Sequence, residues 1–298
     1  MDSPKISVCL PAYNRVEYAR EAIKSVLSQT YNDYELIISD DASTENIEGM
    51  VSSFNDKRLK YFKQKVNLGF IKNWNFCLDK SRGSYIKILG DDDVLLPDCL
   101  EKSVRVLEDK KVVGMVCSDY WTIDGVGKLI DSKQFNSESF RVFKESKIEN
   151  GRQFIKEYFF GARRVGLPSA ILFKKDLLRV VGNFDEAAGS PADIDLWLRI
   201  LRISDFYYID EKLLNMRWHE GNLSQKLEDD PFYYRYLIDL LSKNYRFVKK
   251  SFTFIEKVRL FFIYSRSIAK RMVNIKLLRY EIAFCGDIAT LANMIFRT

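Results

Sequence analysis

Residues 6–27 read ISVCLPAYNRVEYAREAIKSVL, and this stretch predicts a buried strand, a turn and a helix in that order. The strand is expected over Ile6–Leu10. Asn14 is expected to be the N-cap of the helix, because Glu17 follows three positions later and apolar residues then recur at helical spacing. A strand followed at once by a helix is the opening of a βαβ unit.

The chain beyond this stretch continues to alternate short apolar strands with helical patterns as far as about residue 130. This alternation is typical of an α/β fold with a mainly parallel sheet flanked by helices. After a turn predicted at Asp124-Gly125 the sheet is expected to become mixed. Further strands are expected at Tyr34–Ser39, Leu59–Lys63, Ser84–Leu89, Val112–Ser118, Phe206–Ile209 and Leu213–Trp218, and helices at Phe70–Leu78, Gly151–Gly161, Lys174–Val181 and Asp193–Ile203, with another opened by Pro97.

The net charge of +6 is concentrated at the carboxyl end of the chain. Residues 241–298 carry twelve Lys and Arg against three Asp and Glu, and every segment from Pro231 onward has a helical pattern. Such a region could lie on anionic lipid, contact nucleic acid, or pack as a helical subdomain with a solvated basic face. Its composition favours the packed subdomain, and we expect no nucleic-acid partner.

The cysteines and the amino terminus bear on the compartment in which the protein works. Five scattered cysteines without a C-x-x-C pair fit a reduced cytoplasm better than a disulfide framework. The apolar run before Pro11 is too short for a signal peptide, and no run is long enough to cross a bilayer. We therefore expect a protein that is neither secreted nor membrane-spanning.

Three consecutive carboxylates, Asp91, Asp92 and Asp93, follow the strand predicted at Ser84–Leu89. In open α/β sheets ligands bind beyond the carboxyl ends of the strands, where Asp40 and Asp41 are also expected. Adjacent carboxylates repel one another unless a cation is present, and Mg²⁺ or Mn²⁺ held by one or two carboxylates is common beside nucleotide phosphates. A solvated acidic turn before the next helix is the alternative.

Several other kinds of site are excluded by what the sequence lacks. His219 is the only histidine, which rules out a zinc site built on several histidines. No G-x-G-x-x-G follows a strand, and no Walker A run is present. Binding of a dinucleotide or ATP through those devices is therefore unsupported.

A series of motifs in the first three quarters of the chain resembles family 2 glycosyltransferases, which have the GT-A fold. The resemblance covers about residues 5–225, and the motifs occur in the family's order. They are ISVCLPAYNR (6–15), SVLSQTY (25–31), IISDDAST (37–44), NLG (67–69), RGSYI (82–86), DDD (91–93), GNFDE (182–186), DIDLWLR (193–199) and RWH (217–219).

This resemblance implies a Rossmann-like, nucleotide-sugar-binding GT-A domain over residues 1–228. Residues 1–118 would form its nucleotide-binding half and residues 119–228 its acceptor half. Residues 229–298 would be a basic helical extension.

The resemblance also implies where the donor nucleotide would bind. Asp40 would accept a hydrogen bond from the N3–H of uracil or thymine, which favours a UDP-sugar or a dTDP-sugar, and Asp91 would lie beside the ribose or the waters of a metal. The other implied nucleotide-binding residues are Pro11, Ala12, Tyr13, Asn14, Asp41 and Asn67.

A divalent metal, Mn²⁺ or Mg²⁺, is implied at the acidic stretch. Asp92 is the expected ligand, with Asp93 and His219 completing the metal site and Arg217 near the diphosphate. The family's stretch usually begins with aspartate where this chain has Gly90. Ser169 would border the acceptor pocket, and an ordinary edge strand is the alternative there.

Asp193 matches the family's catalytic base, which removes the acceptor's hydroxyl proton during an inverting displacement. The family commonly has glutamate before this base, and here Ala192 stands there. Asp195 therefore competes for the role, although residues two apart point about 200° apart around a helix. A first-turn carboxylate that favours the helix dipole is the alternative for Asp193.

These features together predict an inverting sugar transferase of the surface-polysaccharide or O-antigen type, acting on a glycan or lipid-linked saccharide. It would be cytoplasmic, with peripheral contact to the inner face of the membrane through residues 241–298. Two alternatives are a catalytically degenerate binding or scaffold protein and a sugar nucleotidyltransferase. The latter needs a glycine-rich loop after the first strand, where this chain has Pro11-Ala12-Tyr13-Asn14-Arg15.

Overall fold

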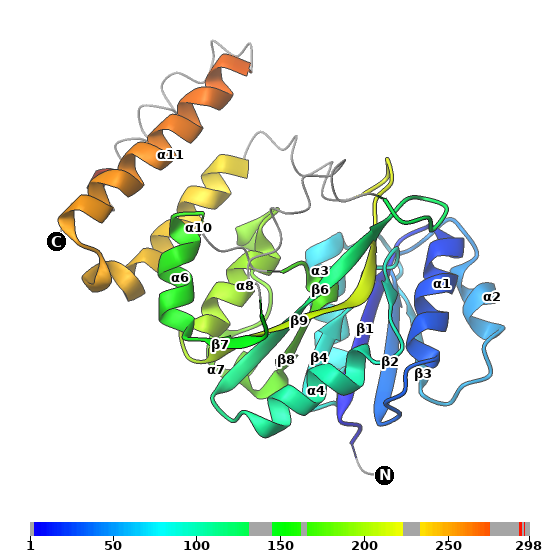
Figure 1. Ribbon diagram of the computed structural model, residues 1–298. Coiled ribbons are helices and arrows are strands. Elements are labelled where there is room, and N and C mark those ends of the chain that lie inside the picture. The colour runs from blue at the N-terminus through cyan, green and yellow to red at the C-terminus, as the bar shows by residue number, and fades with distance from the viewer. Residues whose placement is uncertain are drawn as a thin grey trace.

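The computed structural model describes residues 3–130, 145–161, 166–222 and 233–274, together with 292, 293 and 295. A twisted sheet lies at the centre with helices on both faces, and two further helices extend beside it (Figure 1). The α/β fold with a mixed sheet and a helical extension is therefore confirmed.

Nine strands form one sheet within the described residues, in the order β3-β2-β1-β4-β8-β6-β9-β5, with β7 paired to β9. The first four of these are parallel, as predicted, and β8, β5 and β7 run antiparallel to their neighbours. The strands are β1 (Ile6–Ala12), β2 (Tyr34–Asp40), β3 (Leu59–Lys63), β4 (Tyr85–Ile88), β5 (Val94–Leu95), β6 (Val113–Ile123), β7 (Lys147–Glu149), β8 (Ile171–Lys174) and β9 (Asp205–Arg217).

The helices pack on the two faces of this sheet in separate groups. On one face, Gln29 after α1 accepts a hydrogen bond from the Leu100 backbone N–H of α4. On the other face, the ring of Phe184 contacts the rings of Trp74 from α3 and Trp197 from α8. The helices are α1 (Val16–Leu27), α2 (Ile47–Ser52), α3 (Phe70–Lys80), α4 (Cys99–Asp109), α6 (Gly151–Phe159), α7 (Leu178–Val181), α8 (Ala192–Leu201), α10 (Tyr233–Val248) and α11 (Phe254–Asn274).

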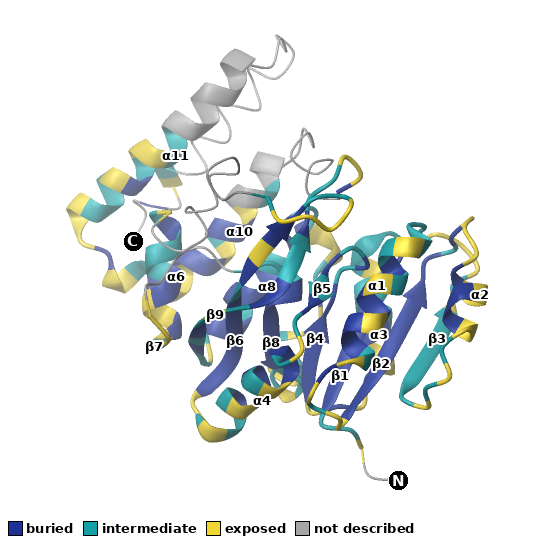
Figure 2. Ribbon diagram, turned by 45° about the vertical axis from the view of Figure 1, so that its right-hand side comes forward, coloured by how far each residue is buried: buried dark blue, intermediate teal, exposed yellow. Residues whose placement is uncertain are grey.

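Because helices cover both faces, β2 is buried along its whole length and β1 at every position except Pro11 (Figure 2). This explains why β1 and β2 are nearly continuous apolar runs rather than alternating ones. The core also contains Leu240, Leu241 and Tyr245 of α10, so it is continuous from the sheet into the carboxyl-terminal helices. The division near residue 228 remains a prediction.

The beginning of α1 differs from the prediction. Asn14 and Arg15 both have left-handed backbones, with φ of 58° and 57°, and the N-cap is Arg15. The Asn14 side chain instead accepts a hydrogen bond from the Thr44 backbone N–H at 2.9 Å. The carboxylate of Glu45 takes the capping role, accepting the N–H groups of Arg15 and Val16 at 3.1 and 2.8 Å.

Two predicted elements in the second half have different forms. The helix predicted over Lys174–Val181 begins as the end of β8, passes through a 3₁₀ turn and becomes helical only at α7. The two closing strands are one strand, β9, whose polar Asp210-Glu211-Lys212 coincides with register irregularities against β6. A bulge absorbs the polar residues without ending the strand.

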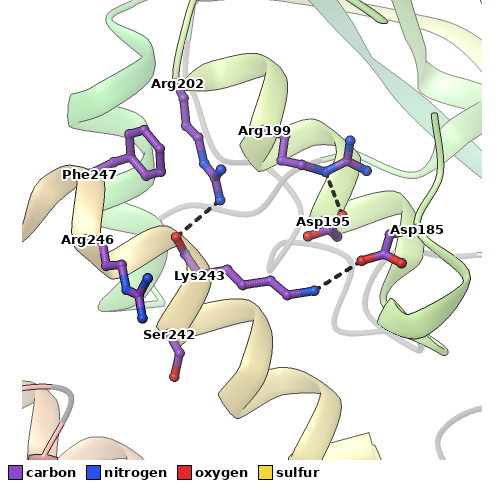
Figure 3. Close-up of a pocket in the computed structure, with 8 residues that line it drawn as sticks. All are labelled: Asp185, Asp195, Arg199, Arg202, Ser242, Lys243, Arg246 and Phe247. Carbon is purple, nitrogen blue, oxygen red and sulfur yellow. Dashed lines mark hydrogen bonds and ion pairs between the residues drawn. The ribbon is translucent and has the colours of Figure 1, made fainter. Parts of the chain in front are cut away.

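The helix α10 is fastened to α8 by polar contacts around an open cavity of about 620 Å³ (Figure 3). Arg202 donates to the Asn244 side chain at 3.1 Å and stacks on Phe247, with 4.2 Å from its guanidinium carbon to the ring centre. Lys243 pairs with Asp185 at 3.1 Å. In the part of the chain that the structure describes, no helix is both long and apolar enough for a membrane span.

Candidate functional site

The carboxyl ends of β1, β2 and β4 bring the predicted binding residues together at one edge of the sheet. Ala12 lies opposite Asp40 in the β1–β2 register, and the Asp41 backbone N–H donates to the Ala12 carbonyl at 2.8 Å. The Tyr13 backbone N–H donates to an Asp91 carboxylate oxygen at 3.1 Å. Segments separated by almost eighty positions thus meet as the parallel topology requires.

Asp40 is fully buried at this edge. One of its oxygens accepts the Ser43 backbone N–H at 2.8 Å, and the other accepts the Tyr61 hydroxyl at 2.7 Å. Burial, together with this hydrogen bond, raises the pKa of Tyr61. Each carboxylate oxygen has a second lone pair, so Asp40 retains acceptor capacity for a ligand.

Asp41 and Asn67 shape the loop before α3. The Asp41 carboxylate accepts the backbone N–H groups of Leu68 and Gly69 at 2.6 and 3.0 Å, and Asn67 donates to the Asp41 carbonyl at 3.2 Å. Gly69 has a φ of 82°, which side chains rarely tolerate. Asp41 and Asn67 therefore hold the backbone of this loop in place beside the site.

The acidic stretch lies where it was predicted, with Asp91 and Asp93 buried and Asp92 partly exposed. Burial raises the pKa of Asp91 to about 8, an effect that Arg15 opposes and that Asp92 and Asp93 reinforce. Burial also raises the pKa of Asp93 to about 7, with further repulsion from Asp92. Two of the three carboxylates thus resist ionisation even with the Arg15 guanidinium beside Asp91.

Arg15 supplies positive charge to this stretch, a role that the sequence analysis missed. Its guanidinium contacts an Asp91 oxygen and an Asp92 oxygen, each at 2.6 Å. Arg15 belongs to the ISVCLPAYNR motif, so the sequence places it near the carboxyl end of the first strand. The direction in which its side chain points depends on the left-handed backbone of Asn14 and Arg15, which the sequence pattern did not predict.

His219 and Asn222 approach the same Asp92 oxygen from the loop after β9. The His219 Nε2 lies 3.1 Å from it, and the Asn222 amide lies 3.4 Å from it. The Gly221 backbone N–H donates to His219 Nδ1, so the ring proton is on Nε2 and points at Asp92. Asn222 is a second residue that the sequence analysis did not assign to the site.

Arg217 is almost completely buried and holds the acidic stretch in place. Its backbone N–H donates to Asp93 at 3.0 Å, and its Nε donates to the Asp92 carbonyl at 2.9 Å. Its remaining nitrogens contact the 124–125 turn and Glu21, and the guanidinium stacks on Tyr18. All three guanidinium nitrogens therefore have protein partners.

Ser169 also reaches the acidic stretch. It belongs to a 3₁₀ turn, Pro168–Ala170, that precedes the interior strand β8, so the edge-strand alternative is wrong. Its hydroxyl accepts the Gly90 backbone N–H at 2.9 Å and lowers the pKa of Asp93 against the effect of burial.

The two candidate bases on α8 have different surroundings. The carboxylate of Asp193 is in the first turn of α8 and accepts the Ile194 backbone N–H at 2.8 Å, and burial raises its pKa to about 6. Asp195 is 1% exposed and pairs with the Arg199 Nε at 2.7 Å (Figure 3). Among the described residues Asp193 therefore has no cation partner, whereas Asp195 is paired with Arg199.

The fit of a divalent metal can be judged from the donors around Asp92. Among the residues with described positions, no three His, Cys, Asp or Glu side chains form a ready metal group. An ion that takes one or two protein ligands, with phosphate oxygens and water as the rest, does not need such a group. Asp92 fits this need because it is the partly exposed carboxylate of the three, although one of its oxygens already contacts a guanidinium and an imidazole. His219 serves as a ligand only in its other tautomer.

Comparison with known proteins identifies the chain's relatives. The family model described as Glycosyl transferase family 2 matches residues 7–175. An uncharacterized glycosyltransferase of Methanocaldococcus jannaschii is 30% identical over 96% of this chain and 98% of its own length. The GalNAc(5)-diNAcBac-PP-undecaprenol beta-1,3-glucosyltransferase of Campylobacter jejuni is 32% identical over 53% of this chain and 57% of its own length.

Solved structures agree on the fold. S. aureus TarS 1-349 in complex with UDP-GlcNAc aligns with a TM-score of 0.61 over 98% of this chain and 90% of that one, at 16% identity. That identity supports the fold alone, whereas the family model covers more than half of the chain. The chain therefore belongs to the family 2 glycosyltransferases.

Proposed function

We propose that the protein transfers a sugar from a UDP-sugar or dTDP-sugar to a hydroxyl of a glycan or lipid-linked saccharide, with inversion, in surface polysaccharide synthesis. The observation that carries this proposal is the convergence of Asp40 and the Asp91–Asp92 pair on either side of β1. Asp40, which would accept a hydrogen bond from the base, and the carboxylates that would lie beside the diphosphate then share one edge of the sheet. A bound nucleoside diphosphate needs this arrangement.

The donor would bind with its base toward Asp40 and its diphosphate toward Asp92. The exposed ring of Tyr13 and the 11–14 turn border the ribose position, and Asp91 fixes that turn through the Tyr13 N–H. A divalent metal held by Asp92 would neutralise charge on the leaving diphosphate. Arg217 and Ser169 would act as positioning residues, because their polar groups contact the acidic stretch itself.

Asp193 would act as the general base. The acceptor hydroxyl proton moves to its carboxylate while the acceptor oxygen bonds to the anomeric carbon, and the bond from that carbon to the diphosphate oxygen breaks. A pKa of about 6 supports this role, because the carboxylate is ionised at neutral pH yet more basic than an exposed aspartate. Asp195 is committed to Arg199.

A lipid-linked acceptor is supported by the name of the Campylobacter jejuni relative, which acts on an undecaprenol-linked saccharide. Such an acceptor would be presented at a membrane surface. The helix α11 exposes Ile255 and Phe262, seven positions apart on one face, after the basic pair Lys249-Lys250. Exposed apolar side chains beside cations suit contact with anionic lipid.

The test is thermal stabilisation of the full chain by UDP, dTDP, GDP and CDP, each with and without Mn²⁺. We expect stabilisation by UDP or dTDP that increases with Mn²⁺ and is lost in Asp92→Asn. A ligand at about one hundred times its Kd stabilises by roughly 2.7 kcal/mol, which is easily measured. Stabilisation by GDP or CDP alone would contradict the donor class, and no stabilisation by any nucleotide would contradict donor binding altogether.

A further inference from the structure

Arg15 bridges the two carboxylates that the proposed donor site needs for a metal. Its Nη2 contacts an Asp91 oxygen and its Nη1 contacts an Asp92 oxygen, both at 2.6 Å. The guanidinium side chain is 28% exposed, against 3% and 14% for its partners, so the contact is shielded from water. Partly buried ion pairs of this kind are stronger than surface pairs, because solvent screens them less.

The backbone is arranged to aim this side chain. Asn14 and Arg15 are consecutive residues with positive φ, and each such conformation costs energy for a residue with a side chain. Hydrogen bonds from outside the turn secure it, with the Asn14 N–H donating to Ser43 Oγ at 2.8 Å and the Arg15 N–H donating to Glu45 at 3.1 Å. A strained turn held by its surroundings in this way is typical of functional positions.

Arg15 and a metal would compete for one atom. The Asp92 oxygen that Arg15 contacts is also the oxygen approached by His219 and Asn222. A divalent ion bound to that oxygen would stand within a few ångströms of the guanidinium, and two cations at that distance repel each other. The two therefore cannot both remain on Asp92 in this arrangement.

We propose that Arg15 is the resident counter-ion of the Asp91–Asp92 pair and that an incoming divalent metal displaces it. This inference rests on the proposed donor site. In the free protein Arg15 offsets the repulsion among the three carboxylates and weakens metal binding. A diphosphate supplies new anionic oxygens for the freed guanidinium, so metal and nucleotide bind more tightly together than separately.

The experiment measures Mn²⁺ binding to the full chain by calorimetry and by the electron paramagnetic resonance signal of free Mn²⁺, without nucleotide. We expect Arg15→Gln to bind Mn²⁺ about tenfold more tightly than the unchanged protein, which corresponds to roughly 1.4 kcal/mol. Without metal, Arg15→Gln should melt at a lower temperature, and Mn²⁺ should restore the loss. Arg15→Lys keeps a cation and should lie between the two.

Arg20→Gln is the matched control. It makes the same change five positions later, within α1, where Arg20 forms a surface pair with Glu17 at 3.2 Å, and it should leave Mn²⁺ affinity unchanged. Equal Mn²⁺ affinity in Arg15→Gln and in the unchanged protein overturns the inference, as does the absence of Mn²⁺ binding in both.

Measurements of Mn²⁺ binding and of nucleotide binding separate the counter-ion role of Arg15 from the transferase activity. Stabilisation by UDP that is independent of Mn²⁺ in every variant would remove the counter-ion role and leave donor binding intact. Tighter Mn²⁺ binding in Arg15→Gln, without any nucleotide binding, would support the counter-ion role and remove the transferase proposal.

Discussion

Asp193 and Asp195 lie two positions apart on α8, and their chemical roles can be separated by substitution. Asp193→Asn keeps the shape of the side chain but cannot accept a proton, so we expect transfer to fall by about 10²–10⁴-fold. Donor binding should be unchanged, because the hydrogen bond described for Asp193 is to its own helix and not to the strand edge that would hold the nucleotide. Sugar transfer and UDP binding are measured on the same preparation.

Asp195→Asn serves as the comparison. It removes the partner of a mostly buried Arg199, so we expect a lower melting temperature and substantial transfer in the folded protein. Full sugar transfer by Asp193→Asn, with loss of transfer in Asp195→Asn, would identify Asp195 as the general base in place of Asp193.

The pKa of Asp193 also predicts how the rate depends on pH. Burial raises this pKa to about 6, and only the ionised form accepts a proton, so kcat should decrease tenfold per pH unit as the pH falls below about 6. Because the folded protein holds this proton more tightly than the unfolded chain, this carboxyl stabilises the fold at low pH. That contribution is lost as the pH rises toward 6.

The measurement uses saturating donor and Mn²⁺, so that titration of Asp91 and Asp93 in the free site does not enter kcat. A kcat that stays constant between pH 5 and 8 would be incompatible with Asp193 as the base.

At the scale of elements, the cap of α1 comes from a distant loop rather than from the helix's own sequence. Glu45 accepts two backbone N–H groups at the positive end of the helix dipole. Glu45→Ala should therefore lower the free energy of unfolding by about 1 kcal/mol. Urea unfolding provides the measurement.

Glu48→Ala removes another exposed carboxylate three positions later, in the first turn of α2, and should cost no more than a few tenths of a kcal/mol. Equal losses of unfolding free energy in the two variants would mean that the hydrogen bonds from the start of α1 to Glu45 do not stabilise the fold specifically.

The elements that the sequence predicted well are those whose pattern is local. The strand β1 and the helix α1 were recognisable because burial on both faces gives a continuous apolar run and one-sided burial gives helical spacing. The cap by Glu45 and the 3₁₀ turn carrying Ser169 depend on segments far apart in the chain. No window of neighbouring residues contains that information.

The candidate site shows the same division. Asp40 and Asp91 to Asp93 could be placed at one sheet edge because parallel strands share their carboxyl ends. Arg15 and Asn222 could not be assigned to the site from the sequence. The direction of the Arg15 side chain follows from a left-handed turn, and that of Asn222 follows from the loop after β9.

At the scale of the whole molecule, the carboxyl-terminal helices share the core of the sheet yet expose an apolar face of their own. If α11 contacts lipid, the full chain should sediment with vesicles that contain phosphatidylglycerol more than with pure phosphatidylcholine. Replacing Lys249 or Lys250 by Gln should weaken that binding by about fivefold each. Ile255→Ser with Phe262→Ser should weaken it further, through loss of apolar burial.

Val126→Ser is the control for the apolar change, since Val126 is 89% exposed but lies in the turn after β6. Equal sedimentation with both vesicle types, or equal losses in Val126→Ser and the α11 variant, would exclude lipid contact through α11.

The bond between Arg217 and Asp93 joins residues 124 positions apart, and this has a consequence for how the protein is made on the ribosome. The four parallel strands β1 to β4 are complete by Ile88 and can pair while synthesis continues. The acidic loop after β4 gains its buried clamp only when Arg217 at the end of β9 has emerged. During translation Asp93 thus lacks its Arg217 partner until late, whereas Arg15 is made early and can pair with Asp91 and Asp92.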